Sequence, residues 1–291
     1  MDHASTPGFV DGVIVEAVVE GLPGYYMVRG YTHTPRYVIV EPYKNVNCKG
    51  SPKAYTKYIH CLGVATTIIE RGNVLRILSM PRTLELLPRS FRGQLEEFIE
   101  YLGIEWAALT GSFAVNCERQ DSDIDLLALY KPGVWRTLRD LYDDGLIRQC
   151  KTRHILEKRS RGPGGEALSI DRMEKSLTDS CYKGIPYTLR LITSISDYPC
   201  YKPLIPLGFI DVELSLRPIG EPITVPTRYL GKVVRVYRGV VEERNEIVVE
   251  TWRTRYQELS DGYYRVRGLL RMDDKGRLTI WPDHGGIIAR A

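Results

Sequence analysis

The sequence predicts an α+β fold in which a mixed β-sheet with helices is flanked by two β-rich modules. Short runs rich in Val, Ile and Tyr, separated by Gly, Pro and Asn, fill both ends of the chain. In the middle, segments of helical period alternate with apolar, strand-like segments. We therefore expect a β-rich module over residues 1–88, a core over 89–218 with a basic insertion at about 148–184, and a second β-rich module over 219–291.

The composition is that of a globular protein, with 43% hydrophobic and 26% charged residues in a chain of 291. No apolar run reaches transmembrane length, and the start MDHASTPGFVDG lacks the features of a signal peptide. We expect a cytoplasmic protein with no membrane partner. The formal charge of +4 and the pI of about 8.6 permit a nucleic-acid partner but do not argue for one alone.

The six cysteines are scattered and form no C-x-x-C pair, which argues against a zinc site. We expect free or buried thiols. Disulfides, as found in cytosolic proteins of hyperthermophiles, stay an alternative. The cysteines are Cys48, Cys61, Cys117, Cys150, Cys181 and Cys200.

The two ends share a phrase, GYYMVRG at Gly24–Gly30 and GYYRVRG at Gly262–Gly268, which suggests a repeated β unit. In a strand, Tyr263, Arg265 and Arg267 lie on one face. Such a face could stack and clamp single-stranded RNA. We favour ordinary strands with solvated arginines, because the sequence contains no specific ribonucleoprotein motif.

The central region begins with a predicted helix. In FRGQLEEFIEYLG the residues Leu95, Phe98, Ile99 and Leu102 lie on one helix face, and Gly103 is a suitable C-terminal stop. A strand ending in Gly-Ser, a short helix, an apolar strand and another helix follow. Their sequences are IEWAALTGS, FAVNCERQ, IDLLALY and VWRTLRDLYDDGLI.

Three aspartates crowd the start of the second of these strands. Asp121 is a common type of turn former. Asp123 and Asp125 differ, because they project from the same face of one strand and lie within several ångströms of each other. Two such carboxylates repel unless a cation lies between them. A hard divalent cation is the expected partner, Mg²⁺ first and Mn²⁺ second.

The Gly111–Ser112 turn upstream complements these carboxylates. A glycine lets the backbone approach a ligand closely, and the serine hydroxyl and N–H at a helix start suit a terminal phosphate. Phosphate on one side and metal carboxylates on the other predict a nucleoside triphosphate site. The chemistry expected there is in-line displacement at the α-phosphorus.

The combination of Gly111-Ser112, a helical spacer and Asp123-Ile124-Asp125 resembles the signature of the DNA polymerase β-like nucleotidyltransferase superfamily. The resemblance covers Ser90 to about Ile147. It implies a nucleotidyltransferase core in which Ser112 contacts the triphosphate and both aspartates bind the catalytic metal.

The resemblance also implies a third carboxylate on a later, neighbouring strand. We favour Asp211 in GFIDVELSL, where it would complete the metal site and help deprotonate the acceptor; Glu213 on the same face is the substitute. A rival alignment uses IPYTLRLI, which places Thr188 where an acid should be. In that case the set is incomplete and the protein is degenerate, with nucleotide binding only.

Two functions follow. The first is metal-dependent transfer of a nucleoside monophosphate from a nucleoside triphosphate to an acceptor hydroxyl, with release of pyrophosphate. The flanking β modules and the stretch Arg148–Arg161, with six basic side chains against one glutamate, favour RNA as acceptor, although protein modification stays open. The second is a noncatalytic nucleotide- or RNA-binding regulatory protein.

Overall fold

A computed structural model describes most of the chain, in two compact units. The described residues are 7–43, 53–118, 122–150, 176–200, 203–242 and 246–291. The first unit comprises Met1–Tyr58, Ala65–Cys150 and Leu177–Cys200, and the second Ile59–Val64, Lys151–Ser176 and Tyr201–Ala291. The predicted boundaries at residues 88 and 218 do not coincide with the limits of these units.

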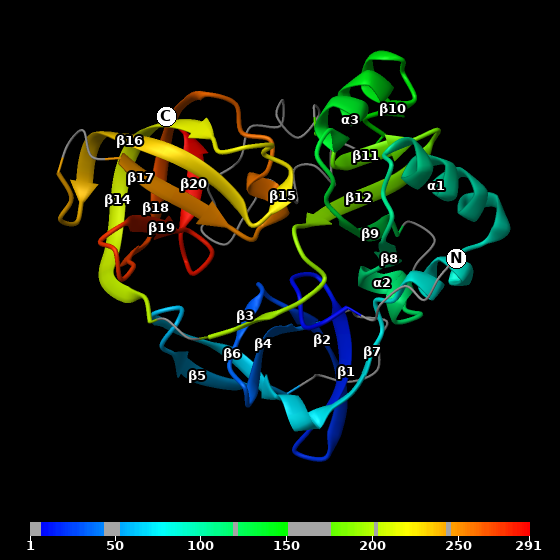
Figure 1. Ribbon diagram of the computed structural model, residues 1–291, viewed down its shortest axis with the longest axis horizontal. Helices are drawn as coiled ribbons and strands as arrows, with labels where there is room; N and C mark the ends of the chain where they lie inside the picture. Colours follow the sequence, from blue (N-terminus) through cyan, green and yellow to red (C-terminus); the bar gives the residue numbers. More distant parts are fainter. Residues whose placement is uncertain (1–6, 44–52, 119–121, 151–175, 201–202, 243–245) are drawn as a thin grey trace. The chain divides into compact units, whose positions relative to one another are not determined.

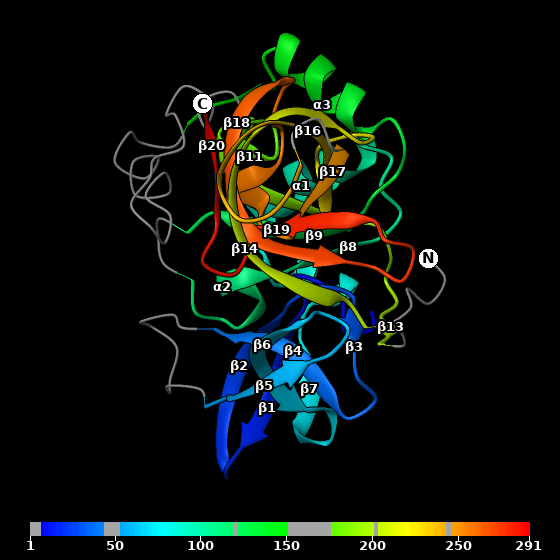
Figure 2. The same ribbon diagram turned by 90° about the vertical axis from the view of Figure 1, so that its left-hand side faces the viewer.

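The first strands form a six-stranded sheet in the described residues, in the order β5-β6-β4-β2-β1-β7 (Figure 2). The strand runs predicted at this end of the chain are confirmed. The bounds are β1 Ile14–Val19, β2 Leu22–Val28, β4 Tyr37–Pro42, β5 Tyr55–Ile59, β6 Val64–Glu70 and β7 Val74–Ile77. Smaller elements are β3 (Thr32–His33), which pairs with β13 (Tyr198–Pro199), and the 3₁₀ turns η1 (Arg71–Asn73) and η2 (Pro81–Leu86).

A second sheet carries the aspartates and has the order β10-β11-β12-β9-β8 (Figure 1). Strand β9 of this sheet runs antiparallel to β8 and parallel to β12. The bounds are β8 Ala107–Leu109, β9 Ile124–Leu129, β10 Ile147–Arg148, β11 Asp179–Tyr182 and β12 Ile185–Ile192. Three α-helices belong to the same described region, namely α1 Arg89–Tyr101, α2 Gly111–Ala114 and α3 Val134–Asp143.

The two longer helices confirm the predictions made from periodicity. Helix α1 buries Leu95 and Phe98, and the Phe98 ring stacks on Tyr182 at 4.7 Å and contacts Tyr187 at 4.8 Å between centroids. Gly103 follows the helix with a φ of +61°, the left-handed conformation typical of a helix C-terminus. The apolar stripe therefore fixes α1 against β11 and β12.

A buried ion pair joins the two sheets of this unit. Asp11, which precedes β1 and is 0% exposed, pairs with Arg190 of β12. The other oxygen of Asp11 accepts a hydrogen bond of 2.8 Å from the Gly30 N–H. Around this pair, apolar side chains from both sheets, including Val15 and Leu127, form a single core.

His33 is fully buried in the same unit, and its ring is held as a neutral tautomer. Its Nε2 lies 2.7 Å from the Phe9 carbonyl and must donate, whereas its Nδ1 accepts from the Ile39 N–H at 3.1 Å. Burial is the main cause that lowers the pKa of His33 from 6.5 to about 4, and it outweighs the nearby Asp197 carboxylate.

The folded state is therefore expected to lose stability as the pH falls from 6.5 towards about 4. Across this interval the unfolded chain binds a proton that the folded chain does not, so the free energy of unfolding drops by about 3 kcal/mol in total. Denaturant titrations at several pH values measure this slope. The His33→Gln variant, which does not titrate in this range, should show a shallower slope; an unchanged slope would contradict the assignment.

The second unit contains a closed five-stranded barrel (Figure 1). The order is β14-β16-β17-β19-β18, and the pairing of β14 with β18 closes the ring. The pair β17–β19 is parallel, and the other pairs are antiparallel. The bounds are β14 Ile205–Pro218, β16 Thr227–Arg238, β17 Glu246–Thr251, β18 Gly262–Met272 and β19 Leu278–Trp281, with β15 Thr224–Val225, β20 Ile287–Arg290 and η3 Thr254–Tyr256 outside the ring.

The barrel interior follows from strand alternation. Val212, Leu214 and Leu216 of β14 point inward with Tyr264 and Val266 of β18, and all five belong to one buried core. The residues between them consequently face outward. Closure removes the unpaired edges that an open sheet of these strands would expose.

The expectation of an α+β fold with a nucleotidyltransferase core is wrong. Strands make up 47% and helix only 16% of the structure, and a closed barrel takes up much of the chain. The segment GFIDVELSL, predicted as a core strand, is part of the 14-residue strand β14 of that barrel. Pairing of β14 with β18, more than forty residues later, depends on long-range contacts that local periodicity does not encode.

The expectation of free thiols is also wrong. Cys150 and Cys181 form a disulfide with a Cα–Cα distance of 5.7 Å, and no cysteine in the described part of the chain is free. In the described ranges, no helix has the length and apolar character needed to span a membrane.

Candidate nucleotide site

The Gly-Ser turn lies directly against one of the predicted metal ligands. The Thr110 N–H donates to the Asp125 carbonyl at 2.9 Å, which ties the end of β8 to the start of β9. Gly111 follows with a φ of +63°, and a Cβ built there would lie 2.0 Å from Oδ2 of Asp125. Only glycine leaves room for the carboxylate at this position.

Ser112 is buried in the four-residue helix α2. Its carbonyl accepts a hydrogen bond of 2.9 Å from the Cys117 N–H, which closes the turn after the helix. One helical turn provides only a short dipole, so phosphate binding here would depend on the turn's N–H groups and the Ser112 hydroxyl.

The two aspartates occupy the positions that the pattern predicted. Asp123 immediately precedes β9, and Asp125 is its second residue; both side chains are half-buried. Because strand side chains alternate, Asp123 and Asp125 lie on one face while Ile124 and Leu126 are buried on the other. The structure therefore brings Gly111, Asp123 and Asp125 together.

Two further residues of the same face were not predicted as a group. Thr188 of β12 lies directly beside Asp125, and Asp179 of β11 lies directly beside Thr188. The Thr188 Oγ1 is 2.9 Å from Oδ2 of Asp123 and 2.9 Å from Oδ1 of Asp179. Two carboxylates, from Asp123 and Asp179, thus lie within hydrogen-bond distance of one hydroxyl, and Asp125 is the cross-strand neighbour of Thr188.

A hydroxyl carries a single proton, so Thr188 can donate to only one of these two carboxylates at a time. The other contact brings two acceptor oxygens within 2.9 Å. The contacts place the carboxylates of Asp123 and Asp179 on one face of the sheet.

In the described residues, no group of three or more His, Cys, Asp or Glu side chains is arranged to hold a metal ion by itself. This does not conflict with a magnesium site, because Mg²⁺ is commonly bound by one or two carboxylates together with substrate phosphates. Asp123 and Asp125 beside the Gly111–Ser112 turn match that second arrangement.

Asp211 does not lie on a strand beside the aspartates, which corrects the favoured assignment of the third carboxylate. In the described chain β9 pairs with β8 and β12, whereas Asp211 lies on β14 of the barrel. Its carboxylate accepts two hydrogen bonds of 2.9 Å from Arg265. These bonds are the main cause that lowers the pKa of Asp211, against a smaller opposing effect of burial.

The substitute Glu213 lies on the same strand and accepts a hydrogen bond of 2.9 Å from the Tyr237 hydroxyl. The rival alignment was therefore the one that identified the neighbouring strand, with Thr188 beside Asp125. Asp121 and most of the basic insertion, residues 151–175, lie outside the described residues.

The position of Asp179 beside Thr188 could have been predicted from the turn that follows it in the sequence. Lys183 and Gly184 form a two-residue turn with φ values of +46° and +87°, which joins β11 and β12 in a tight hairpin. A Lys-Gly turn between two strand-like runs sets the register, and counting back from it places Asp179 opposite Thr188.

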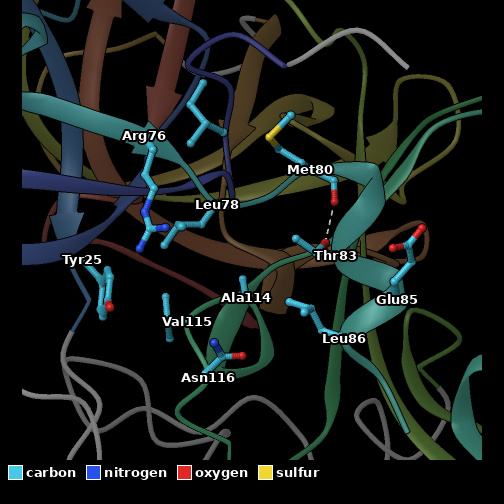
Figure 3. Close-up of a pocket in the computed structure, with 11 residues that line it drawn as sticks. Tyr25, Arg76, Leu78, Met80, Thr83, Glu85, Leu86, Ala114, Val115 and Asn116 are labelled. Carbon is cyan, nitrogen blue, oxygen red and sulfur yellow. Dashed lines mark hydrogen bonds between the residues drawn. The ribbon is translucent and has the colours of Figure 1, made fainter. Parts of the chain in front are cut away.

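A cavity of about 640 Å³ adjoins the far end of α2 (Figure 3). Its volume lies in the range of small-molecule sites. Apolar side chains from η2 and β7 share the lining with polar groups. The lining residues are Tyr25, Arg76, Ile77, Leu78, Met80, Thr83, Glu85, Leu86, Ala114, Val115 and Asn116.

The chain was compared with known families, proteins and structures. No family model, curated protein or solved structure matches the chain. The resemblance to the polymerase β-like nucleotidyltransferases consequently rests on the motif residues alone.

Proposed function

We propose that this protein binds a nucleoside triphosphate with Mg²⁺ or Mn²⁺ and transfers its nucleoside monophosphate to an acceptor hydroxyl, with RNA as the acceptor and pyrophosphate as the second product. The observation that carries the proposal is the contact between Gly111 and Asp125, which sets the phosphate turn against the metal carboxylates. Neither the Gly-Ser turn nor the pair of aspartates alone would support the proposal.

In this proposal each side chain has one task. Ser112 and the Gly111 turn seat the phosphates, while Asp123 and Asp125 hold the cation. A bound divalent cation would neutralise the triphosphate and favour loss of the acceptor proton. The acceptor oxygen bonds to the α-phosphorus, the bridging bond to the β-phosphate breaks, and the acceptor proton passes to a site carboxylate.

The cavity beside α2 supports the proposal in a second way. It is large enough for a nucleoside, and it begins at Ala114, two residues after the proposed phosphate contact Ser112. A triphosphate seated at the turn would therefore have a mixed apolar and polar space available within one helical turn.

The Asp125→Asn variant is expected to lose transfer, because the neutral amide is a poor ligand for a hard cation. The assay incubates the protein with each α-labelled nucleoside triphosphate, Mg²⁺ and total RNA, and a gel shows which macromolecule becomes labelled. Asp143→Asn, which removes an exposed carboxylate at the end of α3, is the matched control and should retain wild-type labelling. Normal transfer by Asp125→Asn would refute the site.

A second function has its own observation. Thr188 stands where a third acid would lie on β12, which favours nucleotide binding without transfer. Calorimetry of triphosphate binding in Mg²⁺ and in EDTA separates the two functions. Binding that requires Mg²⁺ with no labelled product supports the noncatalytic function; absence of both refutes the two together.

A further inference from the structure

The outer face of the barrel carries an ordered grid of charged and aromatic side chains. Cross-strand partners on β16, β14 and β18 form three successive rows. The rows are Lys232–Ser215–Tyr263, Arg235–Glu213–Arg265 and Arg238–Asp211–Arg267. We call these nine residues the barrel grid.

On β14 the grid members alternate with the residues of the barrel core, and on β16 the three basic members are exposed; Asp211 is only 8% exposed. The β14 residues that alternate with the grid, Val212, Leu214 and Leu216, are buried inside the barrel. Rows two residues apart are separated by about 7 Å, and neighbouring strands by about 5 Å. The grid therefore covers a patch of about 14 by 10 Å.

Positive charge dominates this patch. Five of the nine side chains are basic, and two, Asp211 and Glu213, are acidic. Both acids lie on the central strand β14, and Asp211 fixes two arginines beside it: Arg265 binds Asp211 through two hydrogen bonds of 2.9 Å, and the Arg267 Nε lies 3.5 Å from the same carboxylate. The guanidinium groups are thus held in place before any ligand arrives.

Aromatic rings lie among these cations. The Tyr237 ring is contacted by the guanidinium groups of Arg235 at 5.0 Å and Arg265 at 4.9 Å, and its hydroxyl donates to Glu213. Tyr263, at the first row, is 57% exposed, and Phe209, two residues before Asp211 on β14, is 46% exposed. A cavity of about 260 Å³ adjoins the first row and includes Ser215 and Lys232 in its lining.

We propose that the barrel grid, with Tyr237 and Phe209, binds single-stranded nucleic acid, with phosphates on the arginines and bases stacked on Tyr263 and Phe209. The positive charge of the patch alone would also suit an acidic protein as the partner. Exposed rings beside fixed guanidinium groups favour unpaired bases, because a base has a flat face for stacking and a duplex keeps that face covered. The surface goes beyond the proposed function, since none of its residues belongs to the triphosphate site.

The test is fluorescence anisotropy of the full chain with a labelled 12-mer, in EDTA and without nucleotide, so that failure of the triphosphate site leaves the result unaffected. Tyr263→Ala should weaken binding about tenfold or more through loss of stacking. Its matched control is Tyr101→Ala, a tyrosine of α1 with 53% exposure, which should bind as the wild type does.

The double variant Arg235→Gln/Arg238→Gln tests the phosphate contacts. Each lost contact should lower the slope of log affinity against log salt by about 0.7. Asp143→Asn, which changes an exposed carboxylate of α3, should bind like the wild type. RNA and DNA of one sequence, used as parallel probes, identify which source of single strand is preferred. Affinities within twofold of wild type for both grid variants, or equal affinity for a duplex, would overturn the proposal.

Discussion

The Gly111→Ala variant is expected to lose metal-dependent nucleotide binding while it stays folded. The added methyl group would lie 2.0 Å from Oδ2 and 2.7 Å from Cγ of Asp125, so the carboxylate must rotate away from the Gly-Ser turn. Displacing a metal ligand's support costs about tenfold to a hundredfold in metal affinity. Calorimetric titration with Mg²⁺ and triphosphate measures this loss.

The backbone contributes a separate penalty, because alanine is disfavoured by about 1–2 kcal/mol at a left-handed φ. Gly103→Ala is the matched control, since its φ of +61° is close to the +63° of Gly111 and the nearest atom to its new Cβ, Nζ of Lys131, is 3.7 Å away. Both variants should lose unfolding free energy through the backbone, Gly111→Ala should lose more because of its contact with Asp125, and only Gly111→Ala should lose the ligand. Equal nucleotide affinity in the two variants would show that the close contact has no functional role.

Asp11→Ala is expected to destabilise the first unit by about 3–5 kcal/mol, because it leaves the largely buried guanidinium of Arg190 without its carboxylate. The Gly30 N–H also loses its acceptor. Chemical denaturation gives the change in unfolding free energy. A reduction of less than about 1 kcal/mol would mean that water or another side chain replaces the carboxylate.

Two further variants show whether the loss of stability in Asp11→Ala comes from the unpaired buried charge. In Asp11→Ala/Arg190→Leu both charges are gone, so much of the lost stability should return. Glu70→Ala breaks a pair with the well-exposed Arg36, and its unfolding free energy should stay close to that of the wild type because solvent screens exposed pairs.

Local sequence patterns predicted the elements that local interactions form. The stripe of Leu95 and Phe98 and the stop at Gly103 are sufficient to indicate α1, because a helix closes its hydrogen bonds within a few residues. In the same way, the period of two places Asp123 and Asp125 on one face without any knowledge of the fold.

Interactions between distant residues could not be predicted in this way. The segments containing Asp211 and Thr188 both alternate between apolar and polar residues, so periodicity does not decide which one lies beside β9. Asp11 and Arg190 are 179 positions apart, and each alone resembles an ordinary surface charge. Barrel closure is a further example, because it pairs β14 with β18, which are far apart in the sequence.

The disulfide between Cys150 and Cys181 spans 31 positions of the sequence. Asp123 and Asp125 precede this span, Asp179 lies inside it, and Thr188 follows it. A protease that cuts one peptide bond between Cys150 and Cys181 would break the main chain, but the disulfide would still join the two fragments. Separating the two fragments after a cut at this place therefore also requires a reductant.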